Sequence, residues 1–352
     1  MSKYKGGSFS RREIQSLIQG PGKAILICMY FFGIYHKLNI DFFNPEVSCA
    51  VELYKPIAAV VGQQDNLWGQ LISIYLTFII EGLAILGLLF QRYRKVGLAV
   101  GVPFHILIGF TGYAFFMDFS TIVLAMYALT INDESLKRLQ KLYSDRIQSV
   151  SFMIVMLLFS SLLALLMLSQ VYICDGICSS KSFMPLFALY SIPIYLVLLF
   201  STSNGERAFS KSGILYLIPF AFFLNGLSPY VGLKTEGTIA MFSNLHVEGG
   251  TTNHFLHGVI PGTARYTDEI IEIISSNNNI FLEGSKLVRY EFDRSLKKVR
   301  DAEITVISSL TGRHIFPTEH QWSNTYAEAS WLTKKFLTFK PVDDLKPKVC
   351  TH

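Results

Sequence analysis

Residues 67–90 form a long apolar stretch with the sequence LWGQLISIYLTFIIEGLAILGLLF, in which Glu81 is the single charged side chain. A helix needs about 20 predominantly apolar residues to cross the hydrocarbon core of a bilayer. This stretch meets that requirement, so it is predicted to be a transmembrane helix.

Similar stretches recur along the first two thirds of the chain. The whole sequence is 51% hydrophobic and 16% charged, whereas an ordinary soluble domain has about 25% charged residues. We therefore expect an all-α polytopic membrane helix bundle of about seven spans, at residues 20–38, 67–90, 96–112, 113–131, 150–173, 183–200 and 213–232. Asn225, Ser228 and Pro229 interrupt the last stretch, so a surface helix is the alternative there.

The remainder of the chain is more hydrophilic. This change in composition predicts a transmembrane domain at residues 1–232 and an extramembrane α+β domain at residues 233–352. Within the second domain we expect a helix at 268–275 and strands at 239–247, 279–292 and 303–310. A short amphipathic helix is expected at residues 45–61.

The chain has five cysteines, which are too few for a disulfide scaffold and form no zinc pattern. Cys174 and Cys178 lie close enough in sequence for a small disulfide, and two free thiols are the alternative. Cys49 and Cys350 have no cysteine near them in the sequence.

Basic residues near span ends indicate the cytoplasmic side of a membrane protein. They precede the first span and recur in the loops at 91–95 and 137–146, so we expect a cytoplasmic N-terminus and, with seven spans, an external C-terminal domain. If the last stretch is only a surface helix, the C-terminal domain is expected in the cytoplasm. The basic N-terminal stretch is expected to meet anionic lipid headgroups. Nucleic-acid binding is not expected, because the sequence has no basic patch interleaved with aromatic residues.

Ionisable side chains within apolar stretches are costly in a bilayer and often functional. The chain has several such groups, namely His36, Lys37, Glu81, His105 and Asp118. Structural alternatives exist for four of them. Lys37 could snorkel to the outer interface, and Glu81 could pair with Lys37 or His105. His105 could be a hydrogen-bonded core residue, and Asp118 could be interfacial. The functional alternative is that these groups converge, since burial turns a lysine into a usable base.

Two blocks of sequence carry a family resemblance. Residues 30–42, YFFGIYHKLNIDF, are followed after Glu81 by a second block at 95–125 that contains Phe104-His105 and FFMDFSTIVLA. In order and spacing these blocks resemble the membrane domain of the vitamin K-dependent gamma-carboxylase family, the horizontally transferred transmembrane (HTTM) domain. The resemblance covers about a third of the chain.

The resemblance implies roles for particular residues. It places Lys37 as the base that deprotonates a reduced quinone of the vitamin K type, and His105 matches a family histidine. His36 stands where that family commonly has a second lysine. The resemblance also implies a bacterial-type member of the family, located in the inner membrane. The lysine helix is the first span here, and the C-terminal domain is much smaller than the region that binds propeptides in the eukaryotic carboxylases.

A third block, residues 225–254, resembles a signature of bacterial HTTM-like membrane proteins. It ends in the Gly- and Asn-rich sequence NLHVEGGTTNH, residues 244–254. A polar site is predicted from its side chains, and a well hydrogen-bonded loop is the alternative. The residues concerned are Asn244, His246, Glu248, Asn253, His254 and the nearby His257. No metal site is expected.

The sequence therefore predicts an integral membrane enzyme that acts on a lipid-soluble or membrane-presented substrate, with a reduced quinone as candidate cofactor. The candidate catalytic residues are Lys37, His105 and Glu81. Candidate binding residues are His36, Asp118, Asn244, His246, Glu248 and His254. The expected partners are membrane lipid and a peptide or small membrane-associated substrate. The alternative function is that of a non-catalytic membrane protein, either a peptide-maturation or immunity partner or a lipid or ion carrier.

Overall fold

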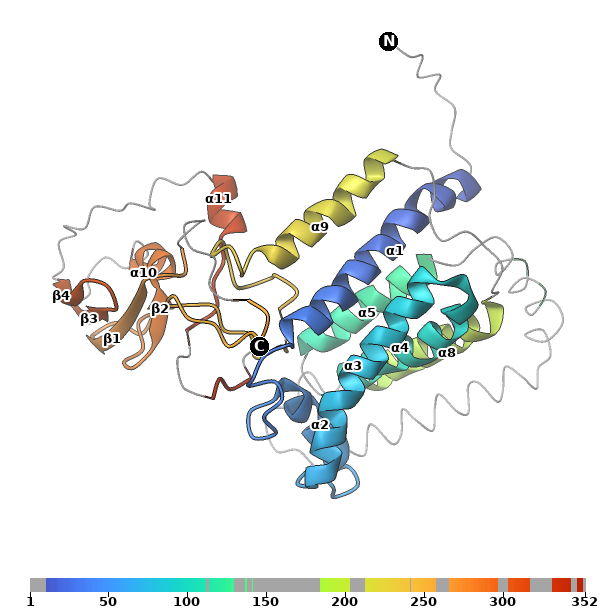
Figure 1. The fold of residues 1–352 in the computed structure, drawn as a ribbon, viewed down its shortest axis with the longest axis horizontal. Helices are drawn as coiled ribbons and strands as arrows, with labels where there is room; N and C mark the ends of the chain where they lie inside the picture. Colours follow the sequence, from blue (N-terminus) through green and yellow to red (C-terminus); the bar gives the residue numbers. More distant parts are fainter. Residues whose placement is uncertain are drawn as a thin grey trace, which may run out of the picture. The chain divides into compact units, whose positions relative to one another are not determined.

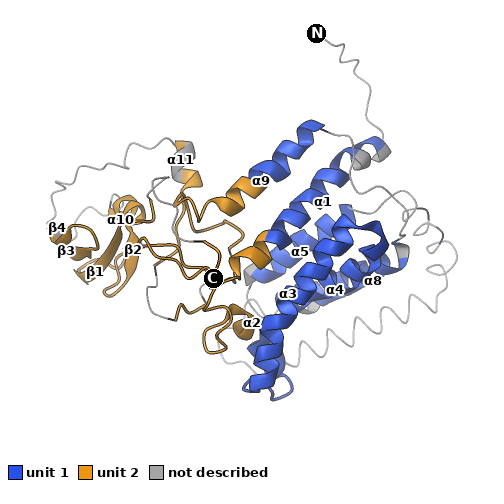
Figure 2. Cartoon of the chain, in the orientation of Figure 1, with its two compact units in different colours: residues 1–31, 53–222 blue, residues 32–52, 223–352 orange. Residues whose placement is uncertain are grey.

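The computed structural model describes residues 11–111, 114–129, 137, 141, 184–202, 213–240, 242–257, 266–296, 303–316, 331–342 and 347–350. The chain divides into two compact units, which differ in colour in Figure 2. Unit 1 comprises residues 1–31 and 53–222, and unit 2 comprises residues 32–52 and 223–352. Unit 2 thus includes residues 32–52, which the sequence predicts to belong to the transmembrane domain.

Unit 1 is helical. It contains most of α1 (Arg11–His36) and α2 (Cys49–Ala59), all of α3 (Leu67–Leu89), α4 (Arg94–Gly109), α5 (Ala114–Leu129) and α8 (Met184–Ser201), and most of α9 (Leu217–Leu227) (Figure 1). Two short 3-10 helices, Gln91–Tyr93 and Gly213–Tyr216, precede α4 and α9. Asn66 begins α3 with an N-cap bond, because its side chain accepts a hydrogen bond from the Gly69 backbone N–H.

Small residues let α3 and α4 approach closely. A Cβ atom added at Gly87 would lie 2.5 Å from the Cα of Gly97, which is too close for any side chain. Gly101 of α4 faces a hydrogen-bonded tyrosine pair, Tyr30 and Tyr127, whose hydroxyl oxygens are 2.8 Å apart. The helices of unit 1 are therefore packed through glycine contacts and a buried polar pair.

Unit 2 contains a four-stranded antiparallel sheet with the strand order β2-β1-β3-β4. Its strands are β1 (Ile270–Ser276), β2 (Lys286–Val288), β3 (Ile304–Ser308) and β4 (Gly312–Phe316). The side chains of Ile271 and Ile273 alternate to one face, where they pack with Phe292 and Leu296 of α10 (Arg289–Leu296). On β1, Ile270 and Glu272 alternate to the other face. A last short helix, α11, spans Trp331–Phe336.

The expectation of an all-α bundle of about seven spans is wrong. Among the described residues, only the helical stretches Leu17–His36 and Leu67–Leu89 are long and apolar enough to cross a membrane. α4 and α5 have 16 residues each, which gives about 24 Å at 1.5 Å per residue, short of a hydrocarbon core of about 30 Å. The predicted span at 150–173 lies outside the described residues.

One face of α3 carries exposed apolar side chains. Trp68, Ile72, Tyr75 and Ile79 recur at helical spacing and are between 57% and 75% exposed. An exposed apolar strip of this kind is typical of a surface that contacts a membrane or another protein. It agrees with a membrane span at α3.

The C-terminal domain differs in detail from its prediction. The helix expected at 268–275 is instead the strand β1, and residues 239–247 form no strand. The segment 279–292 holds β2 and the start of α10, whereas the strand expected at 303–310 is confirmed as β3. The helix expected at 45–61 is confirmed as α2. The Cys174–Cys178 pair lies outside the described residues.

Candidate functional site

Lys37 lies in unit 2, directly after α1 ends at His36. Its side chain is 6% exposed, and its ammonium group lies 5.8 Å from the centre of the fully buried Phe42 ring. Such a distance permits a cation–π interaction. The predicted base is therefore a buried lysine beside an aromatic ring.

His36 is enclosed by aromatic rings. Phe32 and Tyr230 stack on it at centroid distances of 5.2 and 5.4 Å, and its Nδ1 lies 2.7 Å from the Tyr230 hydroxyl. Burial raises the pKa of Tyr230, so this phenol keeps its proton and can donate it to Nδ1. Because His36 and Phe32 are 0% exposed, neither ring offers a face to a quinone.

Two of the three sequence blocks meet in unit 2. The Ile40 N–H donates to the Asn253 carbonyl, and the Phe255 N–H donates to the Leu38 carbonyl. These bonds pair residues 38–40 with residues 253–255 in antiparallel fashion. The block that contains Lys37 and the Gly- and Asn-rich block therefore form one structure.

His254 has a structural role in this pairing. Its Nε2 lies 2.8 Å from the Tyr35 carbonyl and must donate to it, while its Nδ1 accepts the Leu256 N–H at 3.1 Å. Burial lowers the pKa of His254 and outweighs the opposing effect of the Tyr35 carbonyl. A neutral imidazole with both nitrogens engaged is unsuited to bind a metal or to act as a base.

Asn39 and Asn253 also hold the segments together. Asn39 donates to the carbonyls of His36 and Ser243 and accepts the Phe42 N–H. Asn253 donates to the Asp41 carboxylate at 2.7 Å and accepts the His246 N–H at 2.9 Å. These amides cross-link backbone segments that are distant in sequence.

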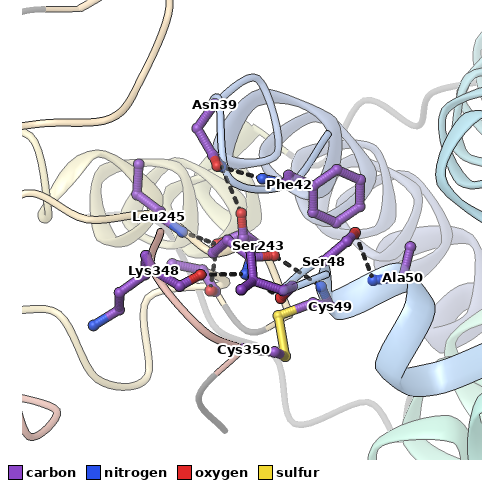
Figure 3. The surroundings of a disulfide bond; sticks show 12 residues. Asn39, Phe42, Ser48, Cys49, Ala50, Ser243, Leu245, Lys348 and Cys350 are labelled. Atoms are coloured by element: carbon purple, nitrogen blue, oxygen red, sulfur yellow. Dashed lines mark hydrogen bonds between the residues drawn. A yellow bond between two sulfur atoms is a disulfide. The ribbon is translucent and has the colours of Figure 1, made fainter. Parts of the chain in front are cut away.

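Asn244 lies beside the disulfide Cys49–Cys350, which is drawn in Figure 3. Its backbone has a positive φ of 54°, and its side chain accepts the Cys49 N–H and donates to the carbonyls of Val47 and Lys348. Both N–H donors of this amide and its oxygen join backbone segments near the disulfide. For Asn244, Asn253 and His254, these contacts are those of the alternative, a well hydrogen-bonded loop.

His246, Glu248 and Thr251 form a different kind of group. His246 Nδ1 lies 3.1 Å from Glu248 Oε2, and His246 Nε2 lies 3.1 Å from Thr251 Oγ1. Burial alone would raise the pKa of Glu248, but the nearby His246, the charge of Lys348 and the hydrogen bond from the Val247 N–H together lower it. Glu248 is therefore an ionised, buried carboxylate, whereas Thr251 is exposed.

This group opens into a cleft of about 340 Å³. The lining also includes Ile270, Glu272, Lys286 and Ile307, which share one face of the sheet. Glu272 and Lys286 are cross-strand partners that form an ion pair at 3.5 Å. Ser309, Val342 and Gly249 complete the lining. Of the predicted binding residues, the lining includes His246 and Glu248.

The remaining predicted residues lie in unit 1. The His105 ring lies 5.6 Å from the Tyr30 ring and 5.5 Å from the Phe119 ring, and Glu81 interacts electrostatically with Tyr30. Glu81 and His105 are both buried around Tyr30, whereas Asp118 is exposed. A contact of Lys37 with Glu81 or His105 stays a prediction.

No group of three or more potential metal ligands occurs within the ranges that the structure describes. No family model, curated protein or solved structure matches the chain. The carboxylase resemblance therefore rests on the quoted residues alone.

Proposed function

We propose that the chain is a membrane-attached enzyme that acts on a lipid-soluble or membrane-presented substrate, with Lys37 as its base. The observation that carries the proposal is the position of Lys37, which is 94% buried by residue area directly after a helix that is apolar enough to cross a membrane. A lysine at the end of such a helix meets substrates that partition into the bilayer. The sequence resemblance assigns the same residue to the base.

The rings described near Lys37 leave no open face for the reduced quinone that the resemblance implies. The surroundings of Lys37 are aromatic, as such a ring requires, but Phe32, His36 and Phe42 are fully buried against their neighbours. A quinone would need walls other than these three rings. The proposal therefore routes no step through a quinone.

Two of the predicted binding residues have structural contacts instead. The side chains of Asn244 and His254 are used in bonds between backbone segments. Such side chains serve the stability of unit 2. They are not part of the proposed active site.

Melting temperatures of Lys37 variants distinguish a catalytic base from a lysine that stabilises the fold. A functional group buried at a cost to stability can be replaced without loss of stability, so Lys37→Met should unfold at or above the temperature of the native protein. If Lys37 instead stabilises the fold, Lys37→Met should lower the melting temperature by more than about 3 °C. Lys37→Arg should then keep the native melting temperature. Lys335→Met, at an exposed position of α11, is the matched control.

A further inference from the structure

The contacts of His246 in unit 2 have the order that nucleophilic catalysis requires. A hydroxyl lies within hydrogen-bond reach of one ring nitrogen, and a carboxylate lies within reach of the other. In enzymes that use a Ser-His-Asp arrangement, the carboxylate fixes the tautomer of the histidine, and the histidine takes the proton of the hydroxyl. Thr251, His246 and Glu248 reproduce this order within one loop.

The charge of Glu248 agrees with such a role. Glu248 is ionised and its Oε2 lies 3.1 Å from His246 Nδ1, so the carboxylate favours the tautomer with the proton on Nδ1. His246 Nε2 then faces the Thr251 hydroxyl. In the structure the Thr251 hydroxyl also reaches the Glu248 carbonyl at 3.2 Å. Rotation of the hydroxyl proton is sufficient to direct it to His246 instead.

Burial distinguishes the three residues. His246 is 9% exposed and Glu248 is 4% exposed, whereas Thr251 is exposed on the lining of the cleft. This difference in exposure is expected if only the Thr251 hydroxyl contacts a ligand, while His246 and Glu248 act on that hydroxyl from the protein interior. A loop that needed hydrogen bonds only for its own stability would not require this distribution.

We propose that Thr251, His246 and Glu248 form a hydrolytic site for small carboxylic esters or thioesters. The acyl chain would lie against the branched side chains of Ile270, Ile307 and Val342. The cleft volume of about 340 Å³ is at the lower end of the range of small-molecule sites, roughly 300–1,000 Å³. The site does not involve Lys37, so the experiment below tests it independently of the function proposed above.

The reaction is balanced without a cofactor. Thr251 Oγ1 bonds to the acyl carbon while its proton passes to His246 Nε2. The bond from the acyl carbon to the leaving oxygen or sulfur then breaks, and His246 returns the proton to the leaving alcohol or thiol. Water hydrolyses acyl-Thr251 by the same proton transfers and releases the carboxylic acid.

Mass spectrometry of the intact protein tests this site. The full-length protein is incubated with p-nitrophenyl butyrate or with a fluorophosphonate, which phosphonylates activated hydroxyl groups. One adduct per chain is expected, located on Thr251 by peptide mapping. Thr251→Val should abolish the adduct, Thr251→Ser should retain it, and Glu248→Gln should slow its formation by about 100-fold or more.

A second threonine–histidine pair provides the matched control. Thr311 Oγ1 lies 2.8 Å from His314 Nε2 on the exposed end of the sheet, outside the cleft lining. Thr311→Val should leave the adduct unchanged. Equal labelling of the native protein and Thr251→Val, or no adduct on Thr251 in a natively folded protein, would overturn the proposal.

Discussion

Cys49 and Cys350 are joined by a disulfide bond, although they lie 301 residues apart in the sequence. The bond ties the segment that follows α1 to the C-terminal end of unit 2 (Figure 3). Disulfides persist in oxidising compartments outside the cytosol. The external position of the C-terminal domain stays a prediction, because the expectation of seven spans on which it rests is wrong.

The first prediction concerns this bond. Removing it with the pair Cys49→Ser and Cys350→Ser should lower the free energy of unfolding by about 2–5 kcal/mol, because the bond restricts the unfolded chain. Urea unfolding with and without reductant measures the change. An equal stability of the native and double-mutant proteins under oxidising conditions would contradict it.

The bond also constrains the path of the chain. Cys49 lies between the two candidate spans, and Cys350 must lie on the same side of the membrane. The chain should thus cross an even number of times between them. In intact cells, a membrane-impermeant maleimide should label single cysteines introduced at the exposed Val61 and Val349 either both or neither. Labelling of one alone would refute the arrangement.

The second prediction concerns Asn244. Asn244→Ala should lower the free energy of unfolding by roughly 1–3 kcal/mol for each buried backbone group left without a partner, namely the Cys49 N–H and the carbonyls of Val47 and Lys348. Asn225→Ala is the control, because Asn225 makes a single exposed bond to the Gly237 carbonyl. Equal effects of the two changes on urea unfolding would show that the Asn244 bonds add no stability.

The third prediction concerns the packing of α3 against α4 in unit 1. Gly87→Ala should lower the melting temperature, since its Cβ would lie 2.5 Å from Gly97 Cα. Gly82→Ala on the same helix should be neutral or stabilising, because no atom lies within 4 Å of the added Cβ and alanine favours helix. If both variants melted alike, the close contact would be absent.

The fourth prediction is a pH dependence. The pKa of His254 is lowered in the fold from the usual 6.5, so the unfolded chain takes up a proton at a higher pH than the folded chain. Stability should therefore decrease as the pH falls below about 6.5. The lowered pKa of Glu248 adds a further loss below about pH 4.3. His254→Gln should weaken the pH dependence of the melting temperature between pH 5 and 7. If His254→Gln left the pH dependence of the melting temperature unchanged, a group other than His254 would cause that dependence.

The sequence allows a partial prediction of this molecule. Apolar length identifies α1 and α3, but hydropathy does not show where a helix ends, so α4 and α5 are predicted as spans that they are too short to form. The segment IIEIISS of β1 has an apolar pattern too short to separate helix from strand.

The site is predicted in outline. The blocks around Lys37 and His254 carry recognisable polar residues, and the structure brings them into one unit. Their individual roles depend on tertiary contacts, such as the Tyr35 carbonyl at His254, that no spacing reveals. The disulfide is missed for the same reason. Thr251 is missed as well, although its place in NLHVEGGTTNH, near both His246 and Glu248, was a usable signal.

The most direct test of the proposed function is whether Lys37 holds a lipid-soluble molecule. The native protein, Lys37→Met and the control Lys335→Met are purified in the same detergent, and their organic extracts are compared by mass spectrometry. We predict a lipid-soluble species that the native protein and Lys335→Met retain and that Lys37→Met loses. Equal amounts of every species in all three extracts would contradict the account.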